Sequence, residues 1–332
     1  MSTTIAHLTD VHLGPIEGFG LRYWNLKRGL GYLNWVRKRR YDHQRAVLDR
    51  IVADMEAQRP DHVAVTGDLA NLGLPQEHIN ALAWLQALGT PERVTVVPGN
   101  HDTYSRIGRD PGARRWAAYM CSNAAGMAYL APGADAGAVP FVRVIGEVAV
   151  VGVDSAIETP PFLAWGRIGK RQLADLAQVL ELLRHAGLFR LVLVHHPPLR
   201  GQADATRALR DAAALEAVLE RGGVELVIHG HNHRNMLAWL PGSVAGPEAG
   251  DAKPGLAAAS GHTAVVGAPS ASLAREHGHE ALARYNLFRI ERNGAGEPAS
   301  WRTELIGRGL AEPGGPVVEL DRRILTFAAA CP

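Results

Sequence analysis

Residues 93–101 read RVTVVPGNH: a run rich in β-branched residues reaches a Pro-Gly pair, and Asn100 and His101 follow at once. β-branched residues favour strands, and Pro and Gly favour the turn that ends one. Four more β-rich runs are followed closely by side chains that can bind a metal: 4–9 before Asp10 and His12, 62–66 before Asp68, 189–194 before His195, and 224–228 before His231 and His233. The sequence thus predicts five strands that end at metal-capable side chains.

Helical patterns lie between these strands. Apolar residues recur at helical spacing in 46–55, in 79–85 after Pro75, in 170–185 and in 206–220. Alternating strands and helices predict an α/β fold with a largely parallel sheet. Because ligand sites of open α/β sheets lie beyond the carboxyl ends of the strands, we expect the five polar clusters to meet there.

The rest of the chain predicts further strands. Residues 141–145 and 148–153, joined at Gly146 and Glu147, read as an antiparallel hairpin, and 241–259 is rich in Gly, Ala and Pro and reads as a loop. Later strands are expected at 263–266, 285–290 and 300–305. We expect them to form a second sheet packed on the first, in one domain over 1–306 with a C-terminal tail at 307–332.

Composition narrows the class of protein. Lys and Arg number 35 against 33 Asp and Glu, a net charge of +2, which gives no sign of an extended DNA-binding face. Two cysteines are too few for a disulfide framework or a thiolate zinc site. The N-terminus shows no basic leader with a long apolar stretch, and no apolar run approaches the ~20 residues of a spanning helix. We therefore expect a cytoplasmic protein.

The polar clusters suit a metal centre. They supply carboxylate, imidazole and amide groups without thiolate, a set typical of zinc, iron or manganese. In Asp10-Val11-His12 and His231-Asn232-His233, side chains alternating along an extended backbone would place both outer residues on one side. A glycine precedes three of the proposed ligands, at Gly67, Gly99 and Gly230, where the chain needs tight turns.

Five motifs in order, LTDVHLG, VTGDLAN, VPGNHD, LVLVHHPP and IHGHNH, resemble those of the calcineurin-like metallophosphoesterase superfamily. The GNHD and GHNH ends are most similar to its bacterial branch of class III cyclic-nucleotide and glycerophosphodiester phosphodiesterases. The resemblance covers about the first 240 residues and implies a four-layer αββα sandwich with two packed mixed β-sheets. It also implies two divalent metal ions, of Mn, Fe, Zn or Co.

The resemblance also implies roles for individual residues. Asp10, His12 and His233 would bind the first ion, Asn100, His195 and His231 the second, and Asp68 both. A hydroxide bridging the ions would attack phosphorus in line, and His101 would protonate the leaving group. Asp102 and His196 are expected just outside the ligands. Many members carry a second acid where this chain has Asn71, so we expect His101 to hold its proton less tightly.

The segment 21–40 is basic, free of acids and interleaved with aromatic residues. Such a segment is typical of a membrane-surface helix, a lid over an anionic substrate or an oligomer interface. The alternative is a solvated basic face that packs its aromatic residues on the domain. Candidate contacts with substrate or membrane are Arg22, Lys27, Arg28, Trp35, Arg37 and Arg39.

The preferred function is a metal-dependent phosphodiesterase acting on a small phosphate ester such as a cyclic nucleotide or a glycerophosphodiester. One alternative is a pyrophosphatase at the inner membrane face acting on a lipid-linked substrate, similar to the UDP-diacylglucosamine hydrolases of the superfamily. The other is a catalytically silent scaffold, which the complete ligand set disfavours. No DNA partner is expected, and the oligomeric state stays open.

Overall fold

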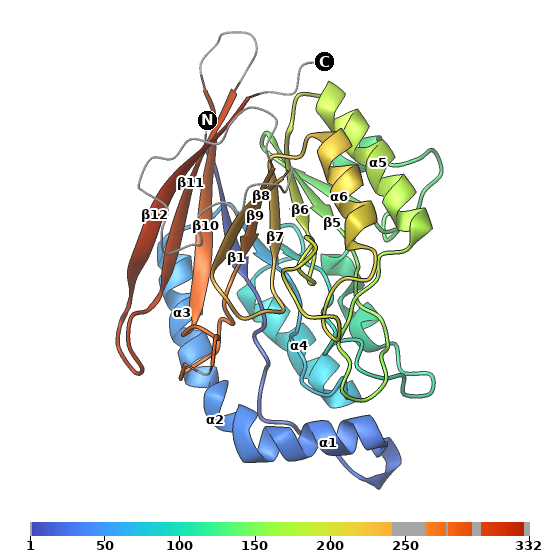
Figure 1. Cartoon of the computed structure of the whole chain (residues 1–332), viewed down its shortest axis with the longest axis vertical. Helices are drawn as coiled ribbons and strands as arrows, with labels where there is room; N and C mark the ends of the chain where they lie inside the picture. Colours follow the sequence, from blue (N-terminus) through green and yellow to red (C-terminus); the bar gives the residue numbers. More distant parts are fainter. Residues whose placement is uncertain (1, 241–262, 277, 294–299, 329–332) are drawn as a thin grey trace.

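The computed structural model describes residues 2–240, 263–276, 278–293 and 300–328, and the strands of this part form two six-stranded sheets (Figure 1). The first sheet has the order β12-β11-β10-β1-β2-β3, from β1 (Ser2–Leu8), β2 (His62–Val65), β3 (Val94–Val96), β10 (Arg284–Asn293), β11 (Ser300–Leu310) and β12 (Val317–Ala328). The second has the order β4-β5-β6-β7-β9-β8, from β4 (Phe141–Ile145), β5 (Val148–Gly152), β6 (Phe189–Leu193), β7 (Leu226–His229), β8 (Met236–Leu240) and β9 (Thr263–Gly267).

Both sheets are mixed. β1, β2 and β3 run parallel in the first sheet, and β5, β6, β7 and β9 run parallel in the second. The remaining strands pair antiparallel, including the predicted β4–β5 hairpin. Three of the predicted polar clusters follow strands of the first sheet and two follow strands of the second, so the site depends on how the sheets face each other.

Three hydrophobic clusters separate four layers. In β1, Ala6 and Leu8 pack with the helices α3 (Arg45–Ala57) and α4 (Pro75–Leu88), whereas Ile5 packs between the sheets. In β5, Val151 packs with α5 (Lys170–His185) and α6 (Ala212–Gly222), whereas Val150 lies between the sheets. Alternate residues of a strand point to opposite faces, which is why each sheet serves two layers. The predicted αββα sandwich is confirmed.

Several boundaries differ from the expectations. β10 and β11 extend the first sheet and do not build the second, because hydrophobic patterning marks strands without specifying their partners. Residues 307–310 complete β11, and β12 is its antiparallel neighbour, so the segment expected as a tail is part of the first sheet. α6 begins at Ala212 and not at residue 206, because the backbone of residues 206–210 hydrogen-bonds to residues 164–166. The loop expected at 241–259 lies outside the described residues.

The basic segment forms a broken helix across one end of the molecule (Figure 1). It consists of η1 (Leu21–Tyr23), α1 (Leu26–Asn34), the π-helical turn η2 (Trp35–Arg39) and α2 (Arg40–Asp42). The Asn25 side chain accepts the Arg28 N–H at 2.8 Å, which fixes the start of α1. The 3₁₀ helices η3 (Gly112–Tyr119) and η4 (Gly126–Tyr129) complete the described elements. Among the described helices, none has the length and apolar content needed to cross a bilayer.

Candidate metal centre

The loops after β1, β2, β3, β6 and β7 bring the seven predicted ligands into one cluster. Asp10 Oδ1 lies 3.1 Å from His233 Nε2, although 223 positions separate the two residues. The seven side chains are all buried: Asp10, His12, Asp68, Asn100, His195, His231 and His233. The two sheets therefore converge where the sequence analysis placed the site.

Two groups of atoms are close enough to share an ion. The ligand atoms of Asp10, His12 and His233 lie within 4.8 Å of one another, as do those of Asp10, Asp68 and His195. His195 Nε2 is 3.5 Å from Asp68 Oδ2 and 3.2 Å from Asn100 Oδ1. Carboxylates at the centre with imidazoles around them form a donor set that fits divalent cations.

Five of the seven residues have left-handed backbones: Asp10 (φ 50°), His12 (φ 42°), Asp68 (φ 56°), His231 (φ 69°) and His233 (φ 52°). The expectation that each ligand tripeptide has an extended backbone is therefore wrong. Asp10 and His12, like His231 and His233, reach the site through tight turns beyond the strand end. This conformation is costly for a residue with a Cβ and persists only where the surroundings enforce it. Backbone hydrogen bonds from Asp10 N to Gly67 O (2.9 Å) and from His12 N to Asp68 O (3.0 Å) do so.

The predicted glycines permit these turns. A Cβ on Gly67, which has φ 89°, would collide with the backbone at Gly99, and a Cβ on Gly99 would collide with the Asp68 carboxylate. A Cβ on Gly230 would collide with the side chains of Thr9 and Asp10. The ligand loops pack against one another so closely that only hydrogen fits at these positions.

One loop, residues 66–71 after β2, orients three imidazoles through main-chain carbonyl groups. Thr66 O lies 2.6 Å from His195 Nδ1, Ala70 O lies 3.1 Å from His12 Nδ1, and Asn71 O lies 2.6 Å from His101 Nδ1. Each Nδ1 donates its hydrogen to a carbonyl oxygen, which leaves the Nε2 lone pair facing the cluster. This tautomer is the one that a metal ligand requires.

Asp102 holds that loop in place. Its carboxylate accepts hydrogen bonds from Asp68 N (2.8 Å), Ala70 N (2.8 Å) and Gly99 N (2.9 Å). The side chain therefore ties the loop after β2 to the loop after β3, as expected of a residue just outside the ligands.

Replacing Asp102 by asparagine should lower the free energy of unfolding by about 1–3 kcal/mol, because an amide nitrogen cannot accept the buried N–H groups that it would face. Urea denaturation measures the change. The matched control is Asp135→Asn, since the exposed Asp135 accepts only the nearby Gly137 N–H and its loss should stay within about 0.5 kcal/mol. Equal midpoints for the two variants would contradict this role.

His101 lies beside the cluster. Asn71 orients it through its main-chain carbonyl group and not through its side chain, which is where many members of the superfamily carry an acid. The Asn71 side chain donates to Leu13 O at 2.9 Å, and only its main-chain carbonyl meets His101. Burial, followed by the nearby Arg39 guanidinium, lowers the pKa of His101 to about 4. The direction agrees with the expectation, but the causes are burial and Arg39 and not the amide at position 71.

Arg39 is the one residue of the basic segment's candidate contacts that reaches the ligands. Its guanidinium nitrogens lie 2.9 Å from His12 Nε2 and 3.1 Å from His101 Nε2. Lys27 and Arg28 instead fasten α1 to the domain: Lys27 Nζ donates to Tyr104 O and Thr159 O, and Arg28 Nε donates to Leu72 O.

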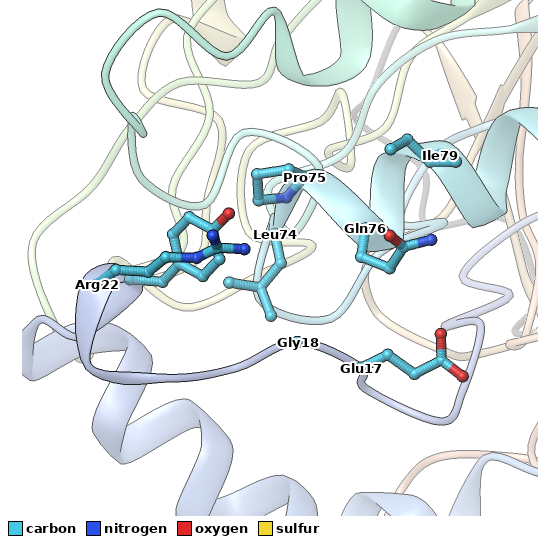
Figure 2. Close-up of a pocket in the computed structure, with 8 residues that line it drawn as sticks. Glu17, Gly18, Arg22, Leu74, Pro75, Gln76 and Ile79 are labelled. Atoms are coloured by element: carbon cyan, nitrogen blue, oxygen red, sulfur yellow. The ribbon is translucent and has the colours of Figure 1, made fainter.

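The other candidate contacts lie away from the cluster. Arg22 stacks on Tyr23 and lines a groove of about 390 Å³ between the start of the basic segment and α4 (Figure 2). Trp35 stacks on Tyr32 with ring centroids 6.0 Å apart, and Arg37 is exposed. None of the predicted metal ligands lines the groove, so it is separate from the metal centre.

Sequence reasoning missed two residues of the site. Glu280 Oε1 lies 3.3 Å from His233 Nδ1 and takes the place that carbonyl oxygens take beside His12 and His195. The His43 ring centroid is 4.6 Å from that of His12, and Ser272 Oγ lies 2.9 Å from His43 Nδ1. Neither residue follows a strand in the predicted pattern, so no local signal marked them.

His196 lies just outside the ligands, as expected, and both of its ring nitrogens meet partners other than the ligands. Its Nδ1 lies 2.8 Å from Ser155 Oγ and its Nε2 lies 3.2 Å from Ala164 O, while its ring packs 4.6 Å from the His231 ring. Burial, then the neighbouring His195, lowers the pKa of His196 to about 3. It is a neutral support for the ligand histidines.

The carboxylates make the cluster a site for positive charge. Burial opposes protonation of His195 and His233, but the Asp68 carboxylate raises the pKa of His195 to about 9 and the Asp10 carboxylate does the same for His233. Burial likewise opposes ionisation of Asp10, yet His233 brings its pKa below the ordinary value. These two imidazoles hold protons beside carboxylates, and a divalent cation would take the place of those protons.

Comparison with known proteins agrees with this geometry. The profile of the calcineurin-like phosphoesterases matches residues 3–235, and no curated protein sequence matches significantly. Among solved structures, the chain is similar to a dimetal phosphatase from Danio rerio, with a TM-score of 0.59 and 16% identity over 99% of each chain. It is also similar to the purple acid phosphatase PPD1 from yellow lupin (Lupinus luteus), with a TM-score of 0.57 and 13% identity over all of this chain and 56% of that one. At such identities the likeness establishes the fold, and the profile match over most of the length establishes that the chain belongs to the calcineurin-like phosphoesterase family.

Proposed function

We propose that the chain hydrolyses phosphodiesters at a dinuclear metal centre formed by the seven ligands. Family membership supports a metal-dependent phosphoesterase. The observation that carries the proposal is the orientation of the imidazoles: the Nδ1 atoms of His12 and His195 meet carbonyl oxygens, and that of His233 meets a carboxylate. The Nε2 atom of each faces the Asp10 or the Asp68 carboxylate, as metal binding requires.

Asp10, His12 and His233 would hold one ion, since their ligand atoms already lie within 4.8 Å of one another. Asn100, His195 and His231 would hold the other, and His231 Nδ1 and Asn100 Oδ1 lie 3.3 and 3.2 Å from His195 Nε2. Asp68 lies between the two sets, with Oδ2 3.5 Å from His195 Nε2 and 4.0 Å from His12 Nε2. Nitrogen and oxygen ligands of this kind accept Mn, Fe, Zn or Co.

Bound ions would polarise the phosphoryl oxygens and make a water acidic enough to attack phosphorus near neutral pH. His101 is placed to handle the leaving group. Its Nδ1 donates to Asn71 O, so Nε2, which accepts from the Arg39 guanidinium here, is the nitrogen that would take up a proton and pass it to the leaving group. Its main-chain N–H donates to Asp68 Oδ1 at 2.7 Å, which fixes His101 relative to the ligands.

Arg39 would bind the phosphoryl group. Its hydrogen bond to His12 Nε2 uses the lone pair that an ion would take, so the two exclude each other. An ion bound to His12 would displace the guanidinium from this nitrogen and leave its donors available beside the centre. A planar guanidinium there fits two oxygens of a phosphate ester.

The preference for diesters over monoesters rests on the similarity of the GNHD and GHNH motifs to the phosphodiesterase branch. Cyclic nucleotides and glycerophosphodiesters are the first substrates to test. A lipid-linked pyrophosphate is the second candidate, favoured by Leu26, Leu30 and Leu33 of the basic segment, which are exposed. A silent scaffold is disfavoured because every ligand position is filled and oriented.

The test is metal reconstitution with paired substrates. Protein stripped with a chelator and reloaded separately with Mn, Fe, Zn or Co is assayed for metal content and for turnover of bis(p-nitrophenyl) phosphate and p-nitrophenyl phosphate. We expect two bound ions per chain and faster turnover of the diester. Metal-loaded protein that hydrolyses neither would favour the scaffold, and faster turnover of the monoester would reject the diester preference.

A further inference from the structure

The orientation of α1 is the reverse of that of an ordinary surface helix. Its polar residues point inward: Arg28 is buried with Nε bonded to Leu72 O, and Lys27 Nζ bonds Tyr104 O at 2.9 Å. Gly31 lies against the Tyr104 hydroxyl and Leu72, with no room for a Cβ. Both charged residues of α1, Lys27 and Arg28, are thus fastened to the domain and do not form a solvated basic face.

The leucines of α1 point outward. Leu26, Leu30 and Leu33 stand at i, i+4 and i+7, which is one face of a helix, and they are 57%, 36% and 44% exposed. Leu21 (93%) and Trp24 (60%) precede them in the same segment. We name these five residues the apolar stripe. Figure 1 shows α1 across one end of the molecule, apart from both sheets, where a flat partner could reach it.

Exposed apolar residues are concentrated in this segment. Of the eleven large hydrophobic residues that are exposed in the described part of the chain, the apolar stripe supplies five, and Tyr41 follows closely as a sixth. Scattered exposed leucines need no explanation, but a contiguous stripe marks a binding surface. We therefore infer that the apolar stripe binds a partner.

The charges beside the stripe indicate which partner. Arg22, Arg37 and Arg40 are exposed, and no acidic residue occurs between Glu17 and Asp42. In a symmetric contact between two copies the same surface meets itself, so these arginines would face each other without a counter-charge. An anionic surface complements them, and a row of leucines with a tryptophan suits the boundary between headgroups and acyl chains.

We propose that residues 21–41 dock the protein on a lipid bilayer that contains anionic lipid. The apolar stripe enters the boundary between headgroups and acyl chains, the exposed arginines contact the headgroups, and Lys27 and Arg28 hold the helix rigidly against the domain. The docking surface is continuous with the metal centre, because η2 follows α1 directly and supplies Arg39 to His12 and His101.

The test is sedimentation of the full-length chain with vesicles of phosphatidylcholine alone and of phosphatidylcholine mixed with phosphatidylglycerol. We expect the wild type to sediment with the mixed vesicles, and binding to weaken as salt is raised. Leu26→Ser/Leu30→Ser/Leu33→Ser should reduce the partition coefficient at least about tenfold. Arg22→Glu/Arg37→Glu should lose the preference for the anionic vesicles.

The matched control is Leu182→Ser/Leu320→Ser, which alters leucines 46% and 38% exposed on α5 and β12. It should sediment like the wild type. Turnover of bis(p-nitrophenyl) phosphate in solution should be unchanged in the triple serine variant, so loss of docking and loss of the catalytic function are separate results. Trp24 gives a second measurement: brominated lipid should quench less fluorescence in Trp24→Phe than in the wild type.

Wild type that stays in the supernatant with both kinds of vesicle would overturn the proposal. So would a triple serine variant that sediments like the wild type, because another surface would then be responsible. A wild-type dimer that the triple variant converts to a monomer, without vesicle binding by either, would identify a second copy of the chain as the partner and also overturn it.

Discussion

The Asp68→Asn variant is expected to bind neither ion stably and to lose at least about 10³-fold in kcat, since bound metal supplies several kcal/mol of transition-state stabilisation. The Asp68 carboxylate lies between the two ligand sets, with Oδ2 near both His195 and His12. An amide removes the negative charge there. Asparagine also tolerates the left-handed backbone of this residue (φ 56°), so the fold should survive.

The measurement is metal content by mass spectrometry together with turnover of bis(p-nitrophenyl) phosphate. Asp61→Asn is the matched control, because the Asp61 carboxylate accepts the Thr4 N–H at 2.7 Å just before β2, at the end of the strand away from the site. It should retain both ions and full turnover. Retention of both ions by Asp68→Asn would contradict the position that we assign to this residue.

The His101→Ala variant is expected to keep both ions and to lose about 10²- to 10⁴-fold in kcat, the range that general acid catalysis contributes. The main-chain N–H of residue 101 still donates to Asp68, so the ligands stay in place. The loss should be larger for a diester with an alkoxide leaving group than for one releasing p-nitrophenolate, which departs without help from a proton.

Two control variants are measured beside His101→Ala. His185→Ala changes a histidine on the outer surface of α5, where Nε2 pairs with Glu181 at 3.0 Å, and should leave kcat unchanged. His195→Ala removes a ligand and should lose metal. If His101→Ala loses as much metal as His195→Ala, then His101 is part of the metal-binding set and its proposed role is wrong.

The sequence predicted the convergence of the loops because strand ends are local features. Polar residues directly after runs such as 62–66 and 189–194 mark the carboxyl edge of a sheet whichever sheet the strand joins. The division of the strands between two sheets was not predictable in this way, since β2 and β6 have similar apolar patterns but lie in different sheets. β12 was missed because charged residues interrupt its pattern, as on an edge strand with one face open.

The site was predictable to the extent that its residues follow strands. Glu280 and His43 were missed because their approach to His233 and His12 depends on tertiary packing alone. The backbone at Asp10 and His12 was mispredicted for a related reason. A strand pattern extrapolates an extended chain, whereas the hydrogen bonds to Gly67 and Asp68 that enforce the turns come from a distant segment.

The loop over residues 66–71 has a consequence for how this enzyme tolerates genetic change. Its carbonyl oxygens, and not its side chains, set the tautomers of His195, His12 and His101. A point mutation cannot delete a carbonyl oxygen, so drift at Ala70 or Asn71 leaves those three tautomers intact. Inserting or deleting a single codon there would misplace all three oxygens together, so positions 70 and 71 should vary in residue type among descendants of the gene, whereas the length of the loop should not vary.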